Sequence, residues 1–260
     1  MGALHEGHLA LLSRSKESCD LTVASVFVNP TQFDRPADLR AYPRTPERDE
    51  ALLRAADCDY VYRPEVADVY PRGAAASTAA LYDFGSLTER MEGALRPGHF
   101  AGVAQVVSRL LQIVQPDRLF LGQKDYQQVA VIRRLIELLG YDLEVVTVPT
   151  VREADGLAMS SRNRRLSGVE REAAGSINLQ LAAVVAGLRC GWPARQLERL
   201  AMEAMAAVPL LKPEYVEVVD GITLLPYQDG QAVTELVVAT AVYAGQVRLI
   251  DNRIARTANP

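Results

Sequence analysis

The first half of the chain alternates strand-like apolar runs with segments of helical periodicity, and this alternation constrains the fold more than any other feature. A Val-rich run at 21–29 precedes a helical pattern at 45–56, and the run 117–122 precedes one at 125–140. Further elements of the same kinds are predicted at 59–64 (strand), 101–116 (helix) and 143–149 (strand). Strands alternating with helices form parallel βαβ units, so we predict a Rossmann-like α/β domain.

The pattern changes near residue 150. A long helix is predicted from Ser167, where Ser167-x-x-Glu170 has the spacing of a capping box, and a second helix at 194–207. The runs 214–220 and 234–252 have the pattern of antiparallel strands. We therefore predict an N-terminal Rossmann-like domain at 1–149 and a smaller α+β lid domain at 150–260. The segment 71–80, rich in Ala, is predicted to be a loop.

Composition excludes several classes of protein. The net charge of −4 disfavours a large phosphate-binding surface, so nucleic acid is not an expected partner. No apolar run is long enough to span a bilayer, so no membrane is expected either. Three widely spaced cysteines, Cys19, Cys58 and Cys190, fit a reducing compartment, and we expect a cytoplasmic protein.

The first candidate site is His5-Glu-Gly-His8, at the start of a helical pattern. The two imidazoles could simply be polar residues at a helix N-terminus. They could share a zinc ion, although there is no HExxH pattern and the only other histidine is His99. They could also lie at the first turn of a helix that binds a phosphate, where Gly7 would allow close approach of a ligand.

A second candidate lies where the run 21–29 ends in Asn29-Pro30. Asn-Pro is common in turns, and Gln32 could be solvated. Alternatively, Gln32 lies above the carboxyl end of a strand, where its amide could donate to a substrate carboxylate or accept from an ammonium group.

The third candidate is Gly-Gln-Lys-Asp at 122–125, between a predicted strand and a helix that Asp125 would cap. Asp125 and Gln128 also have capping-box spacing, so Gln128 could be a capping residue or a ligand. Lys124 is one of three lysines in a chain whose other cations are arginines. A lysine at this turn suggests a compact charge directed at phosphate.

The fourth candidate is the segment 156–167, with two serines and three arginines before the capping Ser167. It could be a solvated basic loop in front of the capped helix. It could also clamp a triphosphate, with Ser160 and Ser161 as donors and Arg162 as a bidentate fork. A loop near a domain boundary can close over a ligand and exclude water.

Taken together, these segments resemble a known family. His-x-Gly-His and Met-Ser-Ser-Arg resemble the HIGH and KMSKS signatures of class I nucleotidyltransferases. Seven segments, in order and spacing, resemble the pantoate–β-alanine ligase family: MGALHEGH, VFVNPTQF, YPRT, RPGHFAGV, LFLGQKDYQQ, MSSRN and RLIDN. The resemblance covers essentially the whole chain.

The resemblance implies ATP-dependent condensation of pantoate with β-alanine, giving pantothenate, AMP and pyrophosphate through pantoyl adenylate. It implies Mg²⁺ bound with ATP, no metal held by protein side chains, and a homodimer joined through the N-terminal domain. His8 and Lys124 would be catalytic, His8 as the acid that assists phosphate departure. The implied ATP-binding residues are Met1, Gly2, His5, Gly7, His8, Gly122, Gln123, Lys124, Asp125, Val151, Met159, Ser160, Ser161 and Arg162. Asn29, Gln32 and Gln128 would bind pantoate or β-alanine.

One departure from the family pattern concerns the first strand of the sheet. Family members have a strand ending in Pro-Thr directly before MGALHEGH, and this strand is missing from the sequence. We expect Met1 to be internal to the natural protein. In a doubly wound sheet that strand is central, so its neighbours are expected to lose a hydrogen-bonding partner.

Three other activities compete with this interpretation. The chain could be a nucleotidyltransferase for another acid or a phosphate ester, a nucleotide-binding protein without catalytic activity, or a zinc hydrolase. AMP release that depends on both pantoate and β-alanine would exclude the first alternative. ATP binding without turnover would identify the second, and stoichiometric zinc would identify the third.

Overall fold

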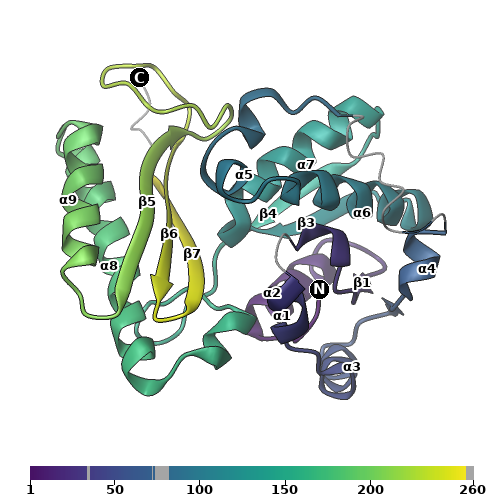
Figure 1. The fold of residues 1–260 in the computed structure, drawn as a ribbon. Helices are drawn as coiled ribbons and strands as arrows, with labels where there is room; N and C mark the ends of the chain where they lie inside the picture. Colours follow the sequence, from purple (N-terminus) through teal and green to yellow (C-terminus); the bar gives the residue numbers. More distant parts are fainter. Residues whose placement is uncertain (34–35, 72, 74–81, 256–260) are drawn as a thin grey trace. The chain divides into compact units, whose positions relative to one another are not determined.

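The computed structural model describes residues 1–33, 36–71, 73 and 82–255. The chain divides into two compact units, Met1–Pro149 and Thr150–Pro260. Most of the loop predicted at 71–80 lies outside the described residues. Figure 1 shows helices and parallel strands in the first unit, and a long antiparallel sheet with two helices in the second.

The first unit has α/β architecture with parallel strand pairs, as predicted. Strand β1 pairs with β2, and β3 pairs with β4, both in parallel. The elements in chain order are α1 (Glu6–Lys16), β1 (Val23–Ser25), η1 (Pro30–Gln32), α2 (Pro36–Ala41), α3 (Pro46–Ala55), β2 (Tyr60–Tyr62), α4 (Val66–Val69), η3 (Gly85–Thr88), α5 (Met91–Leu95), α6 (His99–Val114), β3 (Arg118–Gly122), η4 (Gln123–Asp125), α7 (Tyr126–Leu139) and β4 (Glu144–Val148).

The parallel strands form two separate two-stranded sheets rather than one continuous sheet. The strand predicted at 21–29 is also shorter than expected, because β2 offers β1 only three paired residues. Only part of this strand is buried. Ala24 is buried, but Val23 is 43% exposed, because a two-stranded sheet cannot be covered as fully as an inner strand of a wider one.

Helices α6 and α7 pack on the β3–β4 pair. Val103 and Leu111 of α6 and Ile132 and Ile136 of α7 form a buried cluster, against which apolar residues of both strands pack. Helix α7 ends at Gly140, as predicted, where a φ of +66° suits glycine. These contacts fix the end of β3, and therefore the start of α7, where the Gly-Gln-Lys-Asp segment lies.

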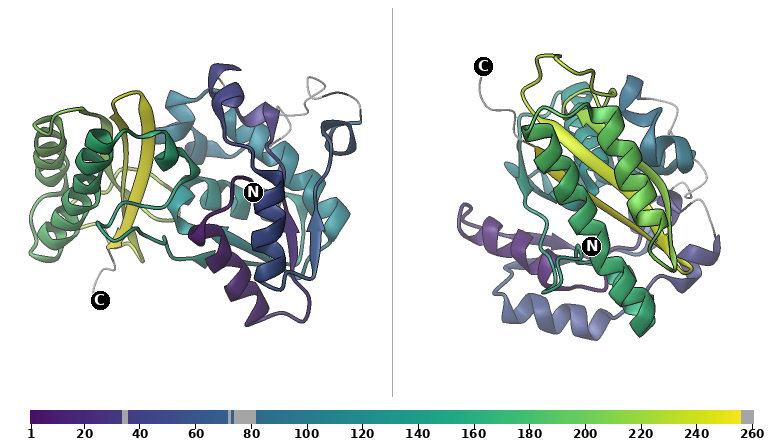
Figure 2. Two further views of the ribbon diagram at one scale, coloured as in Figure 1. Left: turned by 90° about the horizontal axis from the view of Figure 1, so that it is seen from below. Right: turned by 90° about the vertical axis from the view of Figure 1, so that its left-hand side faces the viewer.

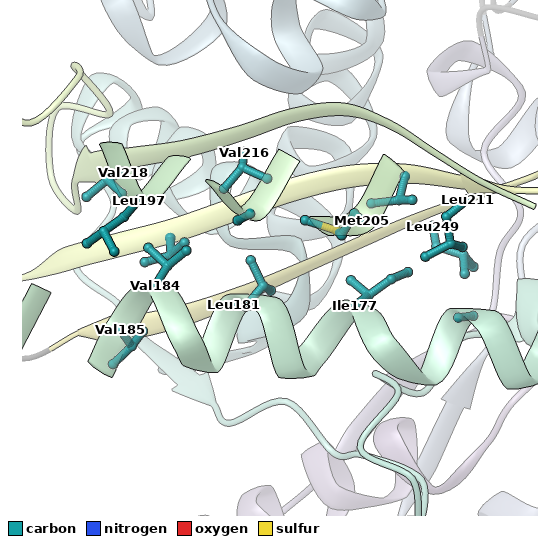
Figure 3. Packing of buried hydrophobic residues seen from close by; sticks show 14 of the residues in the cluster. Ile177, Leu181, Val184, Val185, Leu197, Met205, Leu211, Val216, Val218 and Leu249 are labelled. Carbon is teal, nitrogen blue, oxygen red and sulfur yellow. The ribbon is translucent and has the colours of Figure 1, made fainter. Parts of the chain in front are cut away.

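The second unit is the predicted α+β arrangement. Its sheet has the antiparallel order β5–β6–β7. Figure 2 shows α8 and α9 side by side on one face of this sheet, and Figure 3 shows the core between them, in which Ile177 and Leu181 of α8 face the strands. The elements are η5 (Ser161–Arg165), α8 (Gly168–Arg189), α9 (Ala194–Ala206), β5 (Leu211–Asp220), β6 (Leu236–Ala244) and β7 (Val247–Ala255).

The capping box predicted at the start of α8 is confirmed. The Ser167 Oγ accepts from the Glu170 N–H, and the Glu170 carboxylate accepts from the Ser167 N–H at 2.8 Å. Among the described residues, no helix has both the length and the apolar character needed to cross a membrane.

Candidate active site

The His-x-Gly-His segment begins helix α1, with both rings turned back onto the backbone. The Nδ1 of His5 accepts from the Gly7 N–H at 3.2 Å, and the Nδ1 of His8 accepts from the His5 N–H at 3.3 Å. Since a backbone N–H can only donate, the proton of each neutral ring lies on Nε2. The ring centroids are 4.1 Å apart. The two imidazole rings therefore lie side by side in the first turn, each with Nδ1 turned to the backbone.

The electrostatic surroundings keep His8 neutral. Burial is the main cause that lowers the pKa of His8 from 6.5 to about 2, and the nearby His5 ring, the N-terminal ammonium and Lys124 act in the same direction. Helix α1 packs against β3, so His8 of α1 and Lys124 of η4, which follows β3, lie in the same part of the first unit. Without an anion nearby, a positive charge on His8 is strongly disfavoured.

The turn that leads into α1 is tied to β1 and to α3. The Met1 carbonyl accepts from the Phe27 N–H at 2.8 Å, and Gly2 packs so closely that an added Cβ would lie 3.3 Å from a Val28 methyl group. Ala3 has a φ of +50°, a left-handed conformation that costs a non-glycine residue about 1–2 kcal/mol. Specific contacts must therefore hold this turn in place.

Asp49 of α3 supplies those contacts, and it is buried to 3% exposure. Its carboxylate accepts from the Ala3 N–H at 2.8 Å, the Leu4 N–H at 2.7 Å and the Thr45 hydroxyl at 2.9 Å. Asp49 is not among the residues predicted from the sequence, although the nearby YPRT segment was part of the resemblance. A single acidic residue on an amphipathic helix is usually solvated, so only the fold reveals this role.

The Gly-Gln-Lys-Asp segment lies at the carboxyl end of β3, where an α/β sheet binds ligands. The Lys124 ammonium lies 3.3 Å from the Asp125 carboxylate, and only 18% of the Lys124 side chain is exposed. Gln123 lies between Gly122 and Lys124 in η4. A Cβ built on Gly122 would meet no atom within 4 Å, so the space beside this glycine is open to a ligand.

The prediction that Asp125 caps α7 is wrong. Asp125 occupies the N-cap position but makes no side-chain hydrogen bond to the helix, because its carboxylate contacts Lys124 instead. The capping interpretation of Gln128 therefore fails, and Gln128 stands half-buried on the first turn of α7. The neighbouring Gln127 is structural: its amide accepts from the Glu92 N–H and donates to the Leu87 and Arg90 carbonyls.

Asn29 and Gln32 lie at the two ends of η1, just after β1. Asn29 is 2% exposed. Its Oδ1 accepts from the Tyr70 hydroxyl at 2.5 Å and from the Thr31 N–H at 3.3 Å. Its Nδ2 donates to the Gly102 carbonyl at 3.0 Å and contacts the Gln32 Oε1 at 3.5 Å. The Asn29 side chain is therefore held by hydrogen bonds within the protein, and it contacts the side chain of Gln32.

The predicted residues of the second unit gather in one turn. The Met159 N–H donates to the Val151 carbonyl at 3.0 Å. Ser160 caps η5, where its Oγ accepts from the Arg162 N–H at 3.3 Å, and Ser161 is buried. The structure thus brings Val151 together with the segment 159–162, as one group within this unit.

A buried ion pair fastens this turn to the sheet. Arg152 donates to both carboxylate oxygens of Asp251 on β7, at 2.7 and 2.9 Å, and the Asp251 side chain is 2% exposed. Glu153 accepts from the Asn163 amide at 2.7 Å, which links the segment before the turn to η5. The RLIDN segment of the sequence, to which we assigned no role, includes Asp251.

The metal interpretation of His5 and His8 finds no support in the fold. In the part of the chain that the structure describes, no group of three or more His, Cys, Asp or Glu side chains could hold a metal ion. Both Nδ1 atoms already accept hydrogen bonds from the backbone.

A parallel α/β unit with a charged turn after one strand and an amide-bearing turn after another is the architecture of Rossmann-like proteins. Proteins of this class bind their ligands at the carboxyl ends of the strands. The sequence model described as pantoate-beta-alanine ligase matches residues 1–254. The chain therefore belongs to the pantoate–β-alanine ligase family.

Relatives match over nearly the whole chain. A pantothenate synthetase of Porphyromonas gingivalis is 48% identical over 97% of this chain and 88% of its own length. The crystal structure of pantothenate synthetase from Thermus thermophilus is similar with a TM-score of 0.92 and 45% identity, over 99% of this chain and 91% of that one. A pantoate–β-alanine ligase from Francisella tularensis, crystallised with β-γ ATP and β-alanine, is similar with a TM-score of 0.80 and 32% identity, over 99% and 88%.

Proposed function

We propose that this protein joins pantoate to β-alanine in an ATP-dependent reaction that passes through pantoyl adenylate. Membership of the family and the Francisella tularensis complex with β-γ ATP and β-alanine support the substrates. The observation that carries the proposal is that α1, which begins with His5 and His8, packs against β3, the strand that leads into Lys124.

In the first step a pantoate carboxylate oxygen attacks the α-phosphorus of ATP. The bond between the α-phosphorus and its bridging oxygen breaks, and pyrophosphate leaves. The chemistry requires positioning and stabilisation of negative charge more than a covalent nucleophile. Lys124 supplies a cation, and the neutral His8 donates a hydrogen bond from Nε2 to the phosphates. An approaching triphosphate would raise the pKa of His8 and favour proton donation to the leaving group.

In the second step the β-alanine amine attacks the activated carbonyl carbon. The C–O bond to AMP breaks, AMP leaves, and the amine loses a proton to solvent. Gln32 and Gln128 bind pantoate in this proposal, with Gln32 also near β-alanine. Asn29 contributes to the same subsite by holding Gln32.

The remaining predicted residues would bind the nucleotide. Gly122 leaves open space beside the strand end. The family resemblance supports Ser160, Ser161 and Arg162 as further ATP contacts. Mg²⁺ would enter as the ATP complex, where it neutralises phosphate charge. This fits a donor set in which the described residues form no protein cage for a metal, since Mg²⁺ is often held mainly by phosphates and water. The other proposed ATP contacts are Met1, Gly2, His5, Gly7, Gln123, Asp125, Val151 and Met159.

Two broader properties belong to the same proposal. The family resemblance supports a homodimer joined through the N-terminal unit, which light scattering of the purified protein would measure directly. Three free cysteines fit a reducing cytoplasm.

Pantoate-dependent exchange of labelled pyrophosphate into ATP tests the first step without β-alanine. We expect exchange in the wild type, a fall of about 10²–10⁴-fold in His8→Ala, and a clear loss in Lys124→Met. Lys212→Met is the matched control, because Lys212 is an exposed lysine on β5. Wild-type exchange rates in both site variants would refute the assignment, and exchange that needs no pantoate would refute the proposed reaction.

A further inference from the structure

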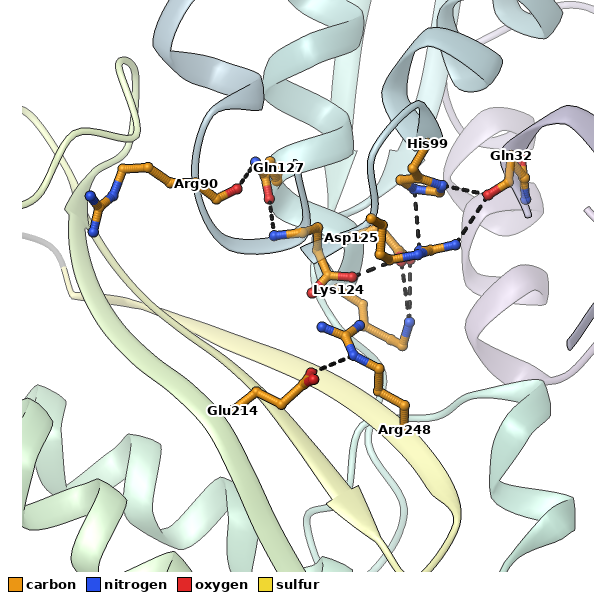
Figure 4. Close-up of polar contacts among 10 residues, drawn as sticks. Gln32, Arg90, His99, Lys124, Asp125, Gln127, Glu214 and Arg248 are labelled. Atoms are coloured by element: carbon orange, nitrogen blue, oxygen red, sulfur yellow. Dashed lines mark hydrogen bonds and ion pairs between the residues drawn. The ribbon is translucent and has the colours of Figure 1, made fainter. Parts of the chain in front are cut away.

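The backbone carbonyl of Gln32 accepts hydrogen bonds from Arg96, at the end of α5, and from His99, the first residue of α6. His99 contacts it through Nδ1 at 2.8 Å, and Arg96 donates to it from Nη2 at 3.1 Å. Arg96 also lies 3.4 Å from the other ring nitrogen of His99. Figure 4 shows the His99 ring directed at the Gln32 carbonyl. One backbone oxygen of the proposed substrate site is thus held from two sides.

The partners of His99 define its protonation. A carbonyl oxygen can only accept, so Nδ1 carries the proton, and an arginine can only donate, so Nε2 must accept. His99 is therefore a neutral ring with both nitrogens engaged. Burial and the adjacent Arg96 are consistent with this, since together they lower the pKa of His99 from 6.5 to about 4. The neutral ring bridges the Gln32 carbonyl and the Arg96 guanidinium, and its single N–H proton is engaged in the hydrogen bond to Gln32.

The first turn of α6 also packs directly on η1. A Cβ built on Gly102 would lie 2.3 Å from the Thr31 carbonyl oxygen and 2.9 Å from the Gln32 nitrogen, so only glycine allows this approach. The Gly102 carbonyl in turn accepts from the Asn29 amide at 3.0 Å. Gly98, with a φ of +81°, turns the chain into α6 and places His99 as its first residue.

The Asn29 amide is oriented as well. Its Oδ1 accepts from the Thr31 N–H, which identifies the oxygen, and its Nδ2 then faces the Gln32 Oε1 at 3.5 Å. The Gln32 Oε1 is thereby turned toward Asn29. The Nε2 end of Gln32 remains to donate to a substrate, and a donor suits the carboxylate or hydroxyl oxygens of pantoate rather than the ammonium of β-alanine.

We propose that His99 and Arg96 are positioning residues that hold the backbone of Gln32, so that its amide nitrogen donates to an acceptor oxygen of the hydroxy acid substrate. This inference rests on the proposed function. Neither residue touches the substrate, and both act through Gln32. The RPGHFAGV segment, to which the reaction assigned no role, thereby acquires one.

The test is a double-variant cycle read out as the KM for pantoate. His99→Leu should raise this KM about 10-fold, the size expected for loss of one hydrogen bond, with the KM for ATP changed less than about 2-fold. His99→Asn places an amide donor near the position of Nδ1 and should restore most of the affinity for pantoate. In a Gln32→Ala background, His99→Leu should have no further effect on the pantoate KM.

Three results would overturn the inference: an unchanged pantoate KM in His99→Leu, equal rises in the pantoate and ATP KM values, or full additivity with Gln32→Ala. If His99→Leu fails to fold, His99→Gln replaces it, because its longer amide reaches toward Arg96 and loses the contact with the Gln32 carbonyl. His99→Gln must then bind pantoate more weakly than His99→Asn. Failure of the proposed function is distinguishable, since the wild type itself would then show no pantoate-dependent turnover.

Discussion

The buried carboxylate of Asp49 is predicted to hold the catalytic turn in its active shape. In Asp49→Ala, the N–H groups of Ala3 and Leu4, both fully buried, lose this acceptor. Each such loss costs about 1–3 kcal/mol, so the free energy of unfolding should fall by about 2–6 kcal/mol. Asp49→Asn keeps one acceptor oxygen but turns an NH₂ group toward the second N–H, and should lose about 1–3 kcal/mol.

The same variants should lose activity through displacement of His5 and His8. Urea unfolding measures the stability. Pantoate-dependent pyrophosphate exchange measures the activity, at a temperature where each variant is folded. The exchange rate should fall at least about 10-fold in Asp49→Asn. Glu50→Gln is the matched control, because Glu50 is the adjacent, exposed residue of α3, and its pairing with Arg54 should contribute less than about 1 kcal/mol. Asp49→Asn with the stability and exchange rate of Glu50→Gln would refute this reasoning.

Two other buried polar groups have consequences that can be measured. The pKa of His99 is about 4 in the folded protein and 6.5 in the unfolded chain. The stabilisation by neutral His99 is therefore fully present above pH 6.5 and is lost as the pH falls toward 4. Between about pH 7 and pH 5 the wild type should lose about 2 kcal/mol of stability through His99, and His99→Asn should not show this loss. Urea unfolding at each pH measures it, and an equal pH dependence in both proteins would contradict the prediction. Asp251→Asn should cost about 3–5 kcal/mol by leaving the Arg152 charge without its partner, and should raise the KM for ATP, whereas the exposed control Glu203→Gln should do neither.

The features that local sequence carries were predictable. The alternation of apolar runs predicted the parallel strand pairs, Gly140 marked the end of α7, and Ser167 with Glu170 marked the start of α8. Each of these depends on residues within a few positions of one another, so the chain itself displays the spacing.

The features that depend on distant partners were not predictable. Asp125 has the sequence position of a cap, yet its carboxylate contacts Lys124 instead of the helix. Asp49 and Tyr70 have no local signature, because their partners Ala3 and Asn29 lie about 40 or more positions away. The resemblance included RPGHFAGV, which contains His99, and YPRT, which ends four residues before Asp49. Only the folded chain connects His99 to Gln32 and Asp49 to the turn before His5 and His8.

Transfer of an oxygen isotope tests the central claim most directly. Pantoate labelled with ¹⁸O in its carboxylate, incubated with the enzyme, ATP and β-alanine, should deliver one ¹⁸O atom to the phosphate of AMP, because the attacking carboxylate oxygen stays bound to phosphorus when the amine displaces AMP. Mass spectrometry of the AMP gives the answer. AMP without the label, or release of ADP and labelled phosphate instead, would contradict formation of pantoyl adenylate.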